Sequence, residues 1–295
     1  MLPPNILLYV ITTKTLSRIL PSKLYLSILY RLRFNRRLNW DNPETYNEKL
    51  QYLKLNCCEK TMIQDVDKYA VREKISNTIG KDYVIPMIGV YNSVDEIDFS
   101  SLPDRFVLKC THGTHCSVIC KDKNTLDINR TKKKINSWMK HNYYYDSREW
   151  PYKKVKPRIM AEQYISDSKG ELIDYKFMCF DGKVKLILVH QDINNINGNH
   201  TLDLYTPDWS LTDIEWGIPK SEKTIPKPVL LDECIRISEM LSKGKPHVRV
   251  DLYIVDNKIY FGELTYYTAA GFKPFRRYND DLMLGNWINI EKVKA

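Results

Sequence analysis

The chain has 295 residues, of which 43% are hydrophobic and 27% charged. This composition is that of a globular protein with one large core or two moderate ones, and it excludes a disordered or fibrous chain. The net charge of +9 is unevenly placed, because residues 1–40 hold seven Lys or Arg and no acid, which leaves +2 on the other 255 residues. A nucleic-acid-binding domain carries its basic residues over a folded face, so we expect no nucleic-acid partner.

The apolar residues 6–11 are too few to cross a bilayer. They precede the basic residues, and no small-residue cleavage pattern follows them, so we expect no secretory signal. The seven cysteines are then expected to be reduced thiols in a cytoplasmic protein.

The first predicted helix covers residues 23–34 and is basic and amphipathic. Lys23, Ser27 and Arg31 lie along one side. The apolar side consists of Leu24, Tyr25, Ile28, Leu29 and Leu32. Two interpretations stay open: the helix packs on its own domain with a solvated basic face, which is the commoner arrangement, or residues 14–37 rest peripherally on the anionic inner face of a membrane.

Four further helices are expected along the chain. One covers residues 42–55, with Asn42 as its cap and Pro43 in its first turn. The others cover residues 61–77, 130–140 and 229–243, and Gly80 and Gly244 end the first and last of these.

The predicted strands are short and several of them form hairpins. Single strands are expected at residues 83–88, 106–109, 117–121 and 158–165. One hairpin joins residues 175–180 to 183–189 through Asp181-Gly182, a type I′ turn signal, and another joins 248–255 to 259–264 through residues 256–258. Antiparallel hairpins interspersed with helices favour an α+β fold.

Residues 109–121, KCTHGTHCSVICK, contain three cysteines and two histidines. A structural zinc site usually takes its ligands from two well-separated pairs, and no second pair stands out downstream, so we predict no tightly bound metal here. Instead, a strand ends at Lys109, a polar turn contains Gly113, and a second strand returns. A lysine beside exposed backbone N–H groups suits a triphosphate, although a single glycine between two strands is more often only a turn.

The last hairpin carries an independent signal. Arg249, Asp251 and Tyr253 alternate with apolar residues and therefore share one face of their strand. If residues 256–258 form a three-residue turn, Asp251 lies opposite Glu263, and two facing carboxylates destabilise a sheet unless a shared cation such as Mg²⁺ removes the repulsion. A two-residue turn would break this register, and a solvent-facing acid pair is the alternative.

Short motifs occur in the order of the ATP-grasp fold: Asp67-Lys68, the strand ending at Lys109, the segment MAEQYI (160–165), RVD (249–251) and FGE (261–263). More specifically, the chain from about residue 40 to its end resembles the TupA-like ATP-grasp proteins, a polysaccharide-biosynthesis branch named for teichuronopeptide synthesis. The segments that carry this resemblance are NPETYNEKLQYLK, DKYAVREKI, VIPMIGVY, LPDRFVLKCTHG, DYKFMCFDGK, VRVDLY and GELTYYTAAGFKPF.

The resemblance implies two α+β subdomains that grip ATP between antiparallel sheets, with a helical N-terminal extension. Residues 1–60 would form this extension and residues 61–295 the ATP-grasp domain. Within that domain the nucleotide-binding loop is expected at about residues 106–121, the hinge at about 160–166 and the metal-binding hairpin at about 248–265.

The resemblance also assigns roles to nucleotide-binding residues. Lys68 and Lys109 would contact phosphates, with Asp174 near the ribose and Lys176 in the nucleotide cleft as a catalytic residue. The remaining candidates are the loop residues His112, Gly113 and Thr114 and the hinge residues Glu162, Gln163, Tyr164 and Ile165, whose backbone would meet adenine. Ordinary surface roles are the alternative for Lys68, Glu162 and Lys176.

In the last hairpin the resemblance makes Asp251 and Glu263 the magnesium ligands and Arg249 the residue that stabilises charge on the transferring γ-phosphoryl group. Thr265 stands where most ATP-grasp enzymes have an asparagine, so its role as a metal ligand is a departure from the pattern. In the basic segment 268–278, Arg276 or Arg277 would grip an acid substrate, and an ordinary basic loop is the alternative.

The implied function is an ATP- and Mg²⁺-dependent carboxylate–amine ligase that acts through an acyl phosphate in capsular or cell-wall polysaccharide biosynthesis. It would join, for example, an amino acid to a uronic acid. A kinase that phosphorylates a sugar or lipid-linked saccharide would use the same residues. A non-catalytic nucleotide- or glycan-binding module is less consistent with the presence of Lys109, Arg249, Asp251 and Glu263.

Overall fold

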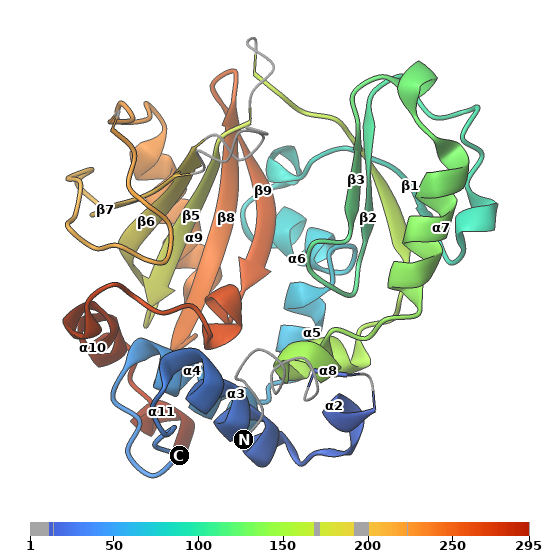
Figure 1. Ribbon diagram of the computed structural model, residues 1–295. Coiled ribbons are helices and arrows are strands. Elements are labelled where there is room, and N and C mark those ends of the chain that lie inside the picture. Colours follow the sequence, from blue (N-terminus) through green and yellow to red (C-terminus); the bar gives the residue numbers. More distant parts are fainter. Residues whose placement is uncertain (1–11, 14, 168–171, 192–200, 223, 295) are drawn as a thin grey trace. The chain divides into compact units, whose positions relative to one another are not determined.

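The computed structural model describes residues 12–13, 15–167, 172–191, 201–222 and 224–294. The chain divides into two compact units, and each unit consists of segments that are not contiguous in the sequence (Figure 1). Unit 1 comprises Met1–Cys58, Tyr145–Glu149 and Ile173–Ala295, and unit 2 comprises Glu59–Tyr144 and Trp150–Leu172. Each unit contains one antiparallel sheet with helices, so the expected α+β class is confirmed.

Unit 1 is built on a five-stranded antiparallel sheet in the order β7-β6-β5-β8-β9. Its strands are β5 (Asp174–Phe180), β6 (Lys183–Gln191), β7 (Thr201–Tyr205), β8 (His247–Val255) and β9 (Lys258–Thr265). The turn between β5 and β6 has Asp181 and Gly182 at positive φ, as the Asp-Gly signal predicts. Helix α9 (Leu231–Ser242) packs against β5, β6 and β8 through a buried stripe at helical spacing.

The N-terminal and C-terminal helices of unit 1 pack together. The N-terminal set is α2 (Leu16–Ile19), α3 (Ser22–Phe34) and α4 (Tyr46–Asn56); the C-terminal set is α10 (Tyr278–Asn286) and α11 (Glu291–Lys294). Helix α4 contacts α10, and Gly285 permits this approach, because a Cβ there would lie 2.1 Å from the carbonyl oxygen of Glu44.

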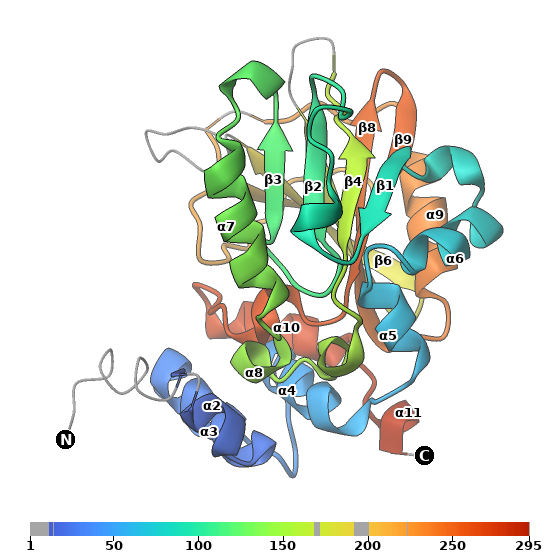
Figure 2. The same cartoon turned by 90° about the vertical axis from the view of Figure 1, so that its right-hand side faces the viewer.

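Helix α3, which follows α2 along the chain (Figure 2), buries Tyr25, Leu26, Leu29 and Tyr30. These side chains form a core cluster with half-buried neighbours that include Leu55 and Phe272. The apolar side predicted from the sequence is therefore partly wrong, since Leu26 and Tyr30 are inside whereas Leu24 is 49% exposed. The stripe that packs is rotated by a fraction of a turn from the predicted one.

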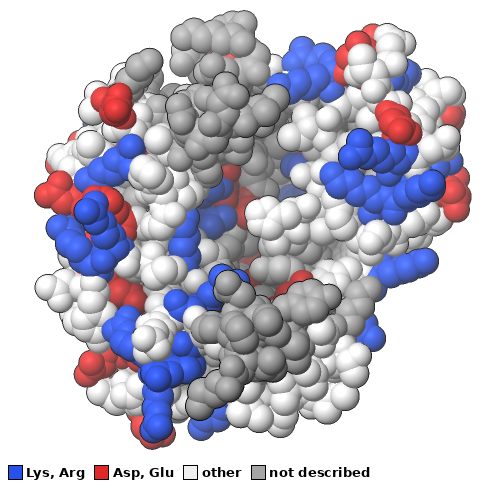
Figure 3. Space-filling model, viewed as in Figure 1, with Lys and Arg blue, Asp and Glu red and all other residues white. Residues whose placement is uncertain are grey.

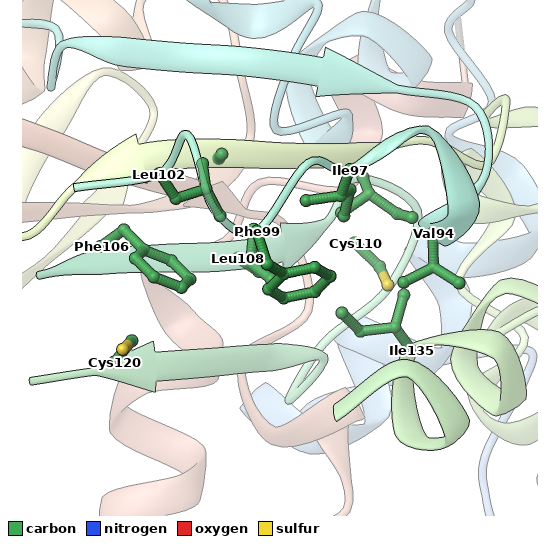
Figure 4. Packing of buried hydrophobic residues seen from close by; sticks show 11 residues of the cluster. Val94, Ile97, Phe99, Leu102, Phe106, Leu108, Cys110, Cys120 and Ile135 are labelled. Atoms are coloured by element: carbon green, nitrogen blue, oxygen red, sulfur yellow. The ribbon is translucent and has the colours of Figure 1, made fainter. Parts of the chain in front are cut away.

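Unit 2 is built on a four-stranded antiparallel sheet in the order β1-β4-β2-β3. Its strands are β1 (Met87–Tyr91), β2 (Phe106–Cys110), β3 (Ser117–Cys120) and β4 (Ile159–Gln163). Alternate residues of β2, namely Phe106, Leu108 and Cys110, face one core cluster together with Ile135 of α7 (Ile128–Met139) (Figure 4). The other β2 residues, among them Lys109, lie on the opposite face.

The remaining elements are short. They are the helices α5 (Thr61–Val66), α6 (Val71–Thr78) and α8 (Tyr144–Ser147) and the 3₁₀ helices Lys81–Tyr83, Val94–Glu96, Lys123–Thr125, Trp150–Lys154 and Thr268–Gly271. Within the described part of the chain, no helix is both long and apolar enough to cross a membrane.

Three predicted boundaries are wrong. The helix expected at 61–77 is divided at Asp67, whose carboxylate accepts hydrogen bonds from the backbone N–H groups of Tyr69 and Ala70. The helix expected from residue 42 begins at Tyr46, because Thr45 and Glu48 form a capping box. The strand expected at 83–88 starts later, at Met87.

Candidate active site

The hairpin of β8 and β9 brings the two predicted metal-binding carboxylates opposite each other, but by a different route from the predicted one. Its turn has two residues, Asp256 and Asn257, both at positive φ as a type I′ turn requires, so Val255 pairs with Lys258. The expected three-residue turn is therefore wrong. A bulge then shifts the register, since Leu252 pairs with Phe261 whereas Asp251 pairs with Glu263.

Gly262 is the extra residue of this bulge. Without it, a two-residue turn would put Asp251 opposite residue 262 and would move Glu263 to the other face of the sheet. A Cβ at position 262 would lie 3.0 Å from the carbonyl oxygen of Asp251 and 3.1 Å from the ring of Tyr253. The close backbone approach explains why a glycine occupies the bulge.

Arg249 joins the two carboxylates. Its Nε and Nη2 donate to the two carboxylate oxygens of Asp251 at 2.6 and 2.8 Å, and Nη2 also reaches Glu263 Oε1 at 3.1 Å. Thr265 accepts from the same Nη2 at 3.1 Å and donates to Glu263 Oε1 at 2.9 Å. Burial opposes the charge of Arg249, but the paired Asp251 carboxylate holds the pKa of its guanidinium above the ordinary value.

The neighbouring strand β5 completes the cluster. Lys176 pairs with Asp251 across the sheet, and its Nζ donates to Asp251 Oδ2 at 2.9 Å and to Asp174. Burial raises the pKa of Asp174 to about 6, and Lys176 opposes that shift. The three carboxylates Asp174, Asp251 and Glu263 together exceed the two cations by one negative charge when all are ionised.

The residues fit a hard divalent cation. Asp251, Glu263 and Thr265 offer oxygen atoms, which Mg²⁺ prefers, and Asp174 Oδ1 is buried without a hydrogen-bond partner among the described residues. No group of three or more His, Cys, Asp or Glu side chains in the described segments is arranged to hold a metal on its own. A cation at this cluster would therefore complete its coordination with phosphate or water oxygens.

In unit 2, a second ion-pair network surrounds Glu162 on β4. Lys109 Nζ lies 2.6 Å from Glu162 Oε2, and Arg72 Nη1 lies 2.7 Å from Glu162 Oε1. Arg72 also donates to the carbonyl oxygen of Ile85 at 2.5 Å. Glu162 is only 4% exposed, so it fixes both cations on the sheet. The sequence prediction missed Arg72, although it lies in the DKYAVREKI segment.

The loop after β2 is held by Lys68 and Asp67. Lys68 Nζ donates to the carbonyl oxygen of Gly113 at 2.9 Å, and its backbone N–H donates to Thr111. Asp67 forms an ion pair with Arg158 at 2.5 Å. Of the predicted nucleotide residues, Lys109 thus lies on β2, His112, Gly113 and Thr114 lie in the loop after it, and Lys68 contacts that loop from the segment between α5 and α6.

Two further ionisable side chains of this region are kept neutral by burial. Burial lowers the pKa of His112, whose Nε2 lies 3.2 Å from the carbonyl oxygen of Trp138, and burial raises the pKa of the Cys110 thiol to about 12. All seven cysteines of the chain are free thiols.

The predicted hinge residues span the end of β4, with Glu162 and Gln163 on the strand and Tyr164 and Ile165 directly after it. Gln163 is exposed and its backbone N–H donates to the carbonyl oxygen of Pro86, while Tyr164 and Ile165 are half-buried. The guanidinium of Arg105 lies 4.2 Å from the ring centre of Tyr164.

A model of one protein family, the TupA-like ATP-grasp family, matches residues 48–289. The chain belongs to this family. The fold and the resemblance read from the sequence are thereby confirmed.

Among solved structures, this ATP-grasp chain is similar to D-alanine–D-alanine ligase from Bacillus anthracis in complex with ATP (17% identity, 78% of this chain and 65% of that one, TM-score 0.42). It is also similar to L-amino acid ligase from Bacillus licheniformis (10% identity, 85% and 56%, TM-score 0.44). The chain thus spans less than two thirds of either protein. The comparison with curated proteins gives no match.

The two arginines expected to hold an acid substrate of the ATP-grasp chain are paired within unit 1. Arg276 Nη1 contacts both carboxylate oxygens of Glu215 at 2.7 Å, and its side chain is 71% exposed. Arg277 contacts Asp280 at 2.9 and 3.0 Å. A substrate carboxylate would have to compete with Glu215 or Asp280 for these guanidinium groups.

Sequence reasoning missed a buried polar anchor beside the metal hairpin. Ala269 and Ala270 both have φ near +51°, a conformation that is unfavourable for alanine. The carbonyl oxygen of Ala270 accepts from Lys54 Nζ at 2.8 Å and from Gln51 Nε2 at 3.2 Å. Lys54 and Gln51 of α4 therefore hold this strained segment in place.

Proposed function

We propose that this protein is an ATP- and Mg²⁺-dependent ligase that activates a carboxylate as an acyl phosphate and joins it to an amine. The observation that carries the proposal is the bulged hairpin, in which Asp251 and Glu263 face each other around Arg249. Membership of the TupA-like ATP-grasp family supports the use of ATP. Because ATP is the phosphoryl donor, we assign the reaction to the cytoplasm.

In this proposal Asp251, Glu263 and Thr265 hold magnesium, which would neutralise charge on the phosphates of ATP. Arg249 would then donate hydrogen bonds to oxygens of the transferring phosphoryl group, whose charge increases in the transition state. Lys176 orients Asp251 through the 2.9 Å hydrogen bond to its Oδ2. The strand pairing already places these side chains next to one another, since Asp251 pairs with both Lys176 and Glu263, and Arg249 pairs with Thr265.

The residues of unit 2 bind the nucleotide in the same proposal. Lys109 offers an ammonium group at the end of an apolar strand, and Glu162 sets its position through the 2.6 Å ion pair. Lys68 orients the loop at Gly113, where backbone N–H groups would meet phosphate oxygens. The apolar side chain of Met87, 42% exposed and paired with Glu162 across the sheet, offers surface for the adenine ring.

The chemistry has two balanced steps. A carboxylate oxygen attacks the γ-phosphorus of ATP, which forms an acyl phosphate and releases ADP. An amine then attacks the acyl carbon, inorganic phosphate leaves with the former carboxylate oxygen, and the amine loses a proton. We propose a surface-polysaccharide setting, in which the acid is a uronic acid and the amine an amino acid.

Trapping with hydroxylamine tests the proposal. Purified protein is incubated with Mg-ATP, hydroxylamine and glucuronate or galacturonate, free or as the nucleotide sugar, and hydroxamate and ADP are measured. We expect hydroxamate with at least one acid, and strong suppression in Arg249→Ala but not in Arg236→Ala, which removes an exposed arginine of α9. Formation of a stable sugar phosphate, without hydroxamate or free phosphate, would contradict the ligase proposal and favour a kinase.

A further inference from the structure

Unit 1 carries a basic surface that the proposed reaction does not use, formed by α2, α3 and the loop after α3. Its basic side chains are all exposed; they are Arg18, Lys23, Arg31, Arg33, Arg36 and Arg37. In Figure 3, Lys and Arg side chains gather over the end of α3 and the neighbouring α10, at the lower left, and over α7 of unit 2, at the upper right.

Among the described residues, the cations of this surface form no close ion pair with an acid, although Arg36 acts electrostatically on the buried carboxylate of Asp281. Residues 1–40 contain no Asp or Glu, and within the described segments no ion pair joins the six cations to a carboxylate. Their contacts are instead with rings and backbone: Arg18 lies over Tyr145, Lys23 over Trp40, Arg36 over Tyr278, and Arg31 donates to the carbonyl oxygen of Asn35. Such contacts orient the groups and leave their positive charge to attract an anionic partner.

The same surface exposes two large apolar side chains. Ile19 on α2 is 71% exposed and Leu24 on α3 is 49% exposed. Leu24 and Arg31 are seven residues apart, so they lie on the same face of α3, opposite the buried stripe. Apolar side chains surrounded by cations suit the boundary between lipid headgroups and acyl chains, where the cations meet phosphates and the apolar groups leave water.

The basic surface of α7 differs in having acidic residues beside it. It is flanked by Asp122 and Asp127, whose carboxylates cap the adjoining helices, and its cations Arg130, Lys133 and Lys140 are exposed. Simple positive charge would not distinguish the two surfaces, so α7 supplies an internal control.

We propose that the surface of α2 and α3 docks unit 1 on an anionic phospholipid bilayer. The apolar stripe of α3 stays packed in unit 1 while Ile19, Leu24 and the cations beside them, Lys23 and Arg31 among them, contact the headgroups. Arg33 is nine residues from Leu24 and lies on the opposite side of α3, so it takes no part in this contact. This docking would bring the enzyme to the membrane face without any membrane-spanning segment in its described part.

Flotation of the full chain with vesicles tests this. The vesicles contain either phosphatidylcholine alone or phosphatidylcholine with ~30% phosphatidylglycerol as a physiological anionic share. We expect binding only to the anionic vesicles and loss of binding at high salt. Each basic side chain near such a surface changes the partition coefficient by about fivefold, so the three substitutions of Lys23→Gln/Arg31→Gln/Arg37→Gln should lower it by roughly 100-fold.

The matched variant Arg130→Gln/Lys133→Gln/Lys140→Gln removes the same charge from α7 and should bind like the wild type. Ile19→Ser/Leu24→Ser should weaken binding several-fold with the charge unchanged. Circular dichroism shows that each variant is folded before it is compared. Equal loss in the α7 variant, no loss in the α3 variant, binding to a soluble polyanion but not to vesicles, or self-association through this surface would each overturn the proposal.

Discussion

Substitution of Glu263 tests the metal site with less effect on stability than substitution of Asp251. The side chain of Glu263 is 32% exposed, whereas Asp251 is 2% exposed and balances the buried charges of both Arg249 and Lys176. Asp251→Asn should therefore lower both stability and activity, because removing one partner of a buried pair leaves unbalanced charge.

We predict that Glu263→Gln raises the Mg²⁺ concentration needed for half-maximal ATP turnover by about tenfold or more, with little change in melting temperature. The measurement is a magnesium titration of ADP formation, accompanied by thermal unfolding. Glu239→Gln is the matched control, since Glu239 is a partly exposed acid of α9 in the same unit, paired with Lys183. Wild-type magnesium dependence in Glu263→Gln would contradict the assignment of this residue.

Lys54 gives unit 1 a distinct dependence on pH. Burial lowers its pKa from 10.5 to about 7, and its Nζ donates to Gln51 Oε1 and to the carbonyl oxygens of Ser147 and Ala270 at 2.7–2.9 Å. The folded chain releases this proton near pH 7, whereas the unfolded chain keeps it to about pH 10.5. The unfolded state thus binds more protons in this window, and the free energy of unfolding rises with pH.

Urea unfolding of the wild type and Lys54→Met at several pH values isolates the contribution of this lysine. We predict that the free energy of unfolding of the wild type, relative to that of Lys54→Met, increases as the pH rises from about 7 toward 10.5. Below pH 7 the difference should level off, because Lys54 is then protonated in both states. A difference that does not change with pH would show that Lys54 keeps its proton in the folded chain.

Some single residues are readable from the sequence and others are not. Arg249, Asp251 and Lys109 follow from alternation in strands and from their place at strand ends. Arg72 and Lys54 do not, because a charged residue on a helix normally faces solvent. Only the packed structure shows that Arg72 pairs with Glu162 in unit 2. It likewise shows that Lys54 donates to one side-chain amide oxygen and two backbone carbonyl oxygens in unit 1.

At the scale of elements, the bulge in β9 decides which face Glu263 occupies. Gly262→Val adds a Cβ, which would lie 3.0 Å from the backbone oxygen of Asp251, and two methyl groups beyond it. Either the bulge opens or the register shifts, and both changes separate Glu263 from Asp251. The variant should therefore lose most ATP turnover, measured as ADP formation.

The control for this variant is Gly182→Val, in the turn between β5 and β6, where φ is +78°. It should lower the melting temperature by backbone strain and leave the magnesium dependence of the remaining folded enzyme unchanged. If Gly262→Val affects only stability, or if both variants change the magnesium dependence alike, the bulge does not set the geometry of the site.

The sequence predicts most element types correctly, and its errors have local causes. The capping box of α4 is visible as Thr45-x-x-Glu48, but Asn42 and Pro43 form a competing signal. The break between α5 and α6 comes from Asp67, whose carboxylate accepts from the backbone N–H groups of Tyr69 and Ala70, although an aspartate can equally lie within a helix. The strand β7 has only five residues and is absent from the prediction. The bulge is invisible, because pairing register depends on both strands and strict alternation looks the same with or without it.

At the scale of the whole molecule, Met1–Cys58 and the C-terminal segments share unit 1. Lys49 on α4 donates to the carbonyl oxygens of Gly285 and Ile288 at 2.9 and 3.0 Å, and Asn47 donates to Asp281 from its backbone and side chain at 3.0 Å. These contacts make α4 part of the core of unit 1.

We therefore predict that deletion of residues 1–60 abolishes cooperative unfolding of unit 1. The measurement is thermal unfolding followed by circular dichroism, with tryptophan fluorescence in a Trp138→Phe/Trp150→Phe background as a local probe, since the tryptophans that remain after the deletion, Trp209, Trp216 and Trp287, all belong to unit 1. The triple substitution Lys23→Gln/Arg31→Gln/Arg37→Gln serves as the control, because it changes charge on the same region and leaves its packed side chains intact. An unchanged melting temperature in the deletion variant would mean that this region is a separate extension.

The central claim, that the carboxylate is activated through phosphate transfer, is tested most directly by oxygen tracing. The acid that supports hydroxamate formation is labelled with ¹⁸O in its carboxylate and is converted with Mg-ATP and an amino acid, and the phosphate is examined by ³¹P NMR. A ligase that forms an acyl phosphate must place one ¹⁸O from each acid in inorganic phosphate. Inorganic phosphate without ¹⁸O, or a phosphorylated saccharide that keeps both labelled oxygens in its carboxylate, would contradict the account.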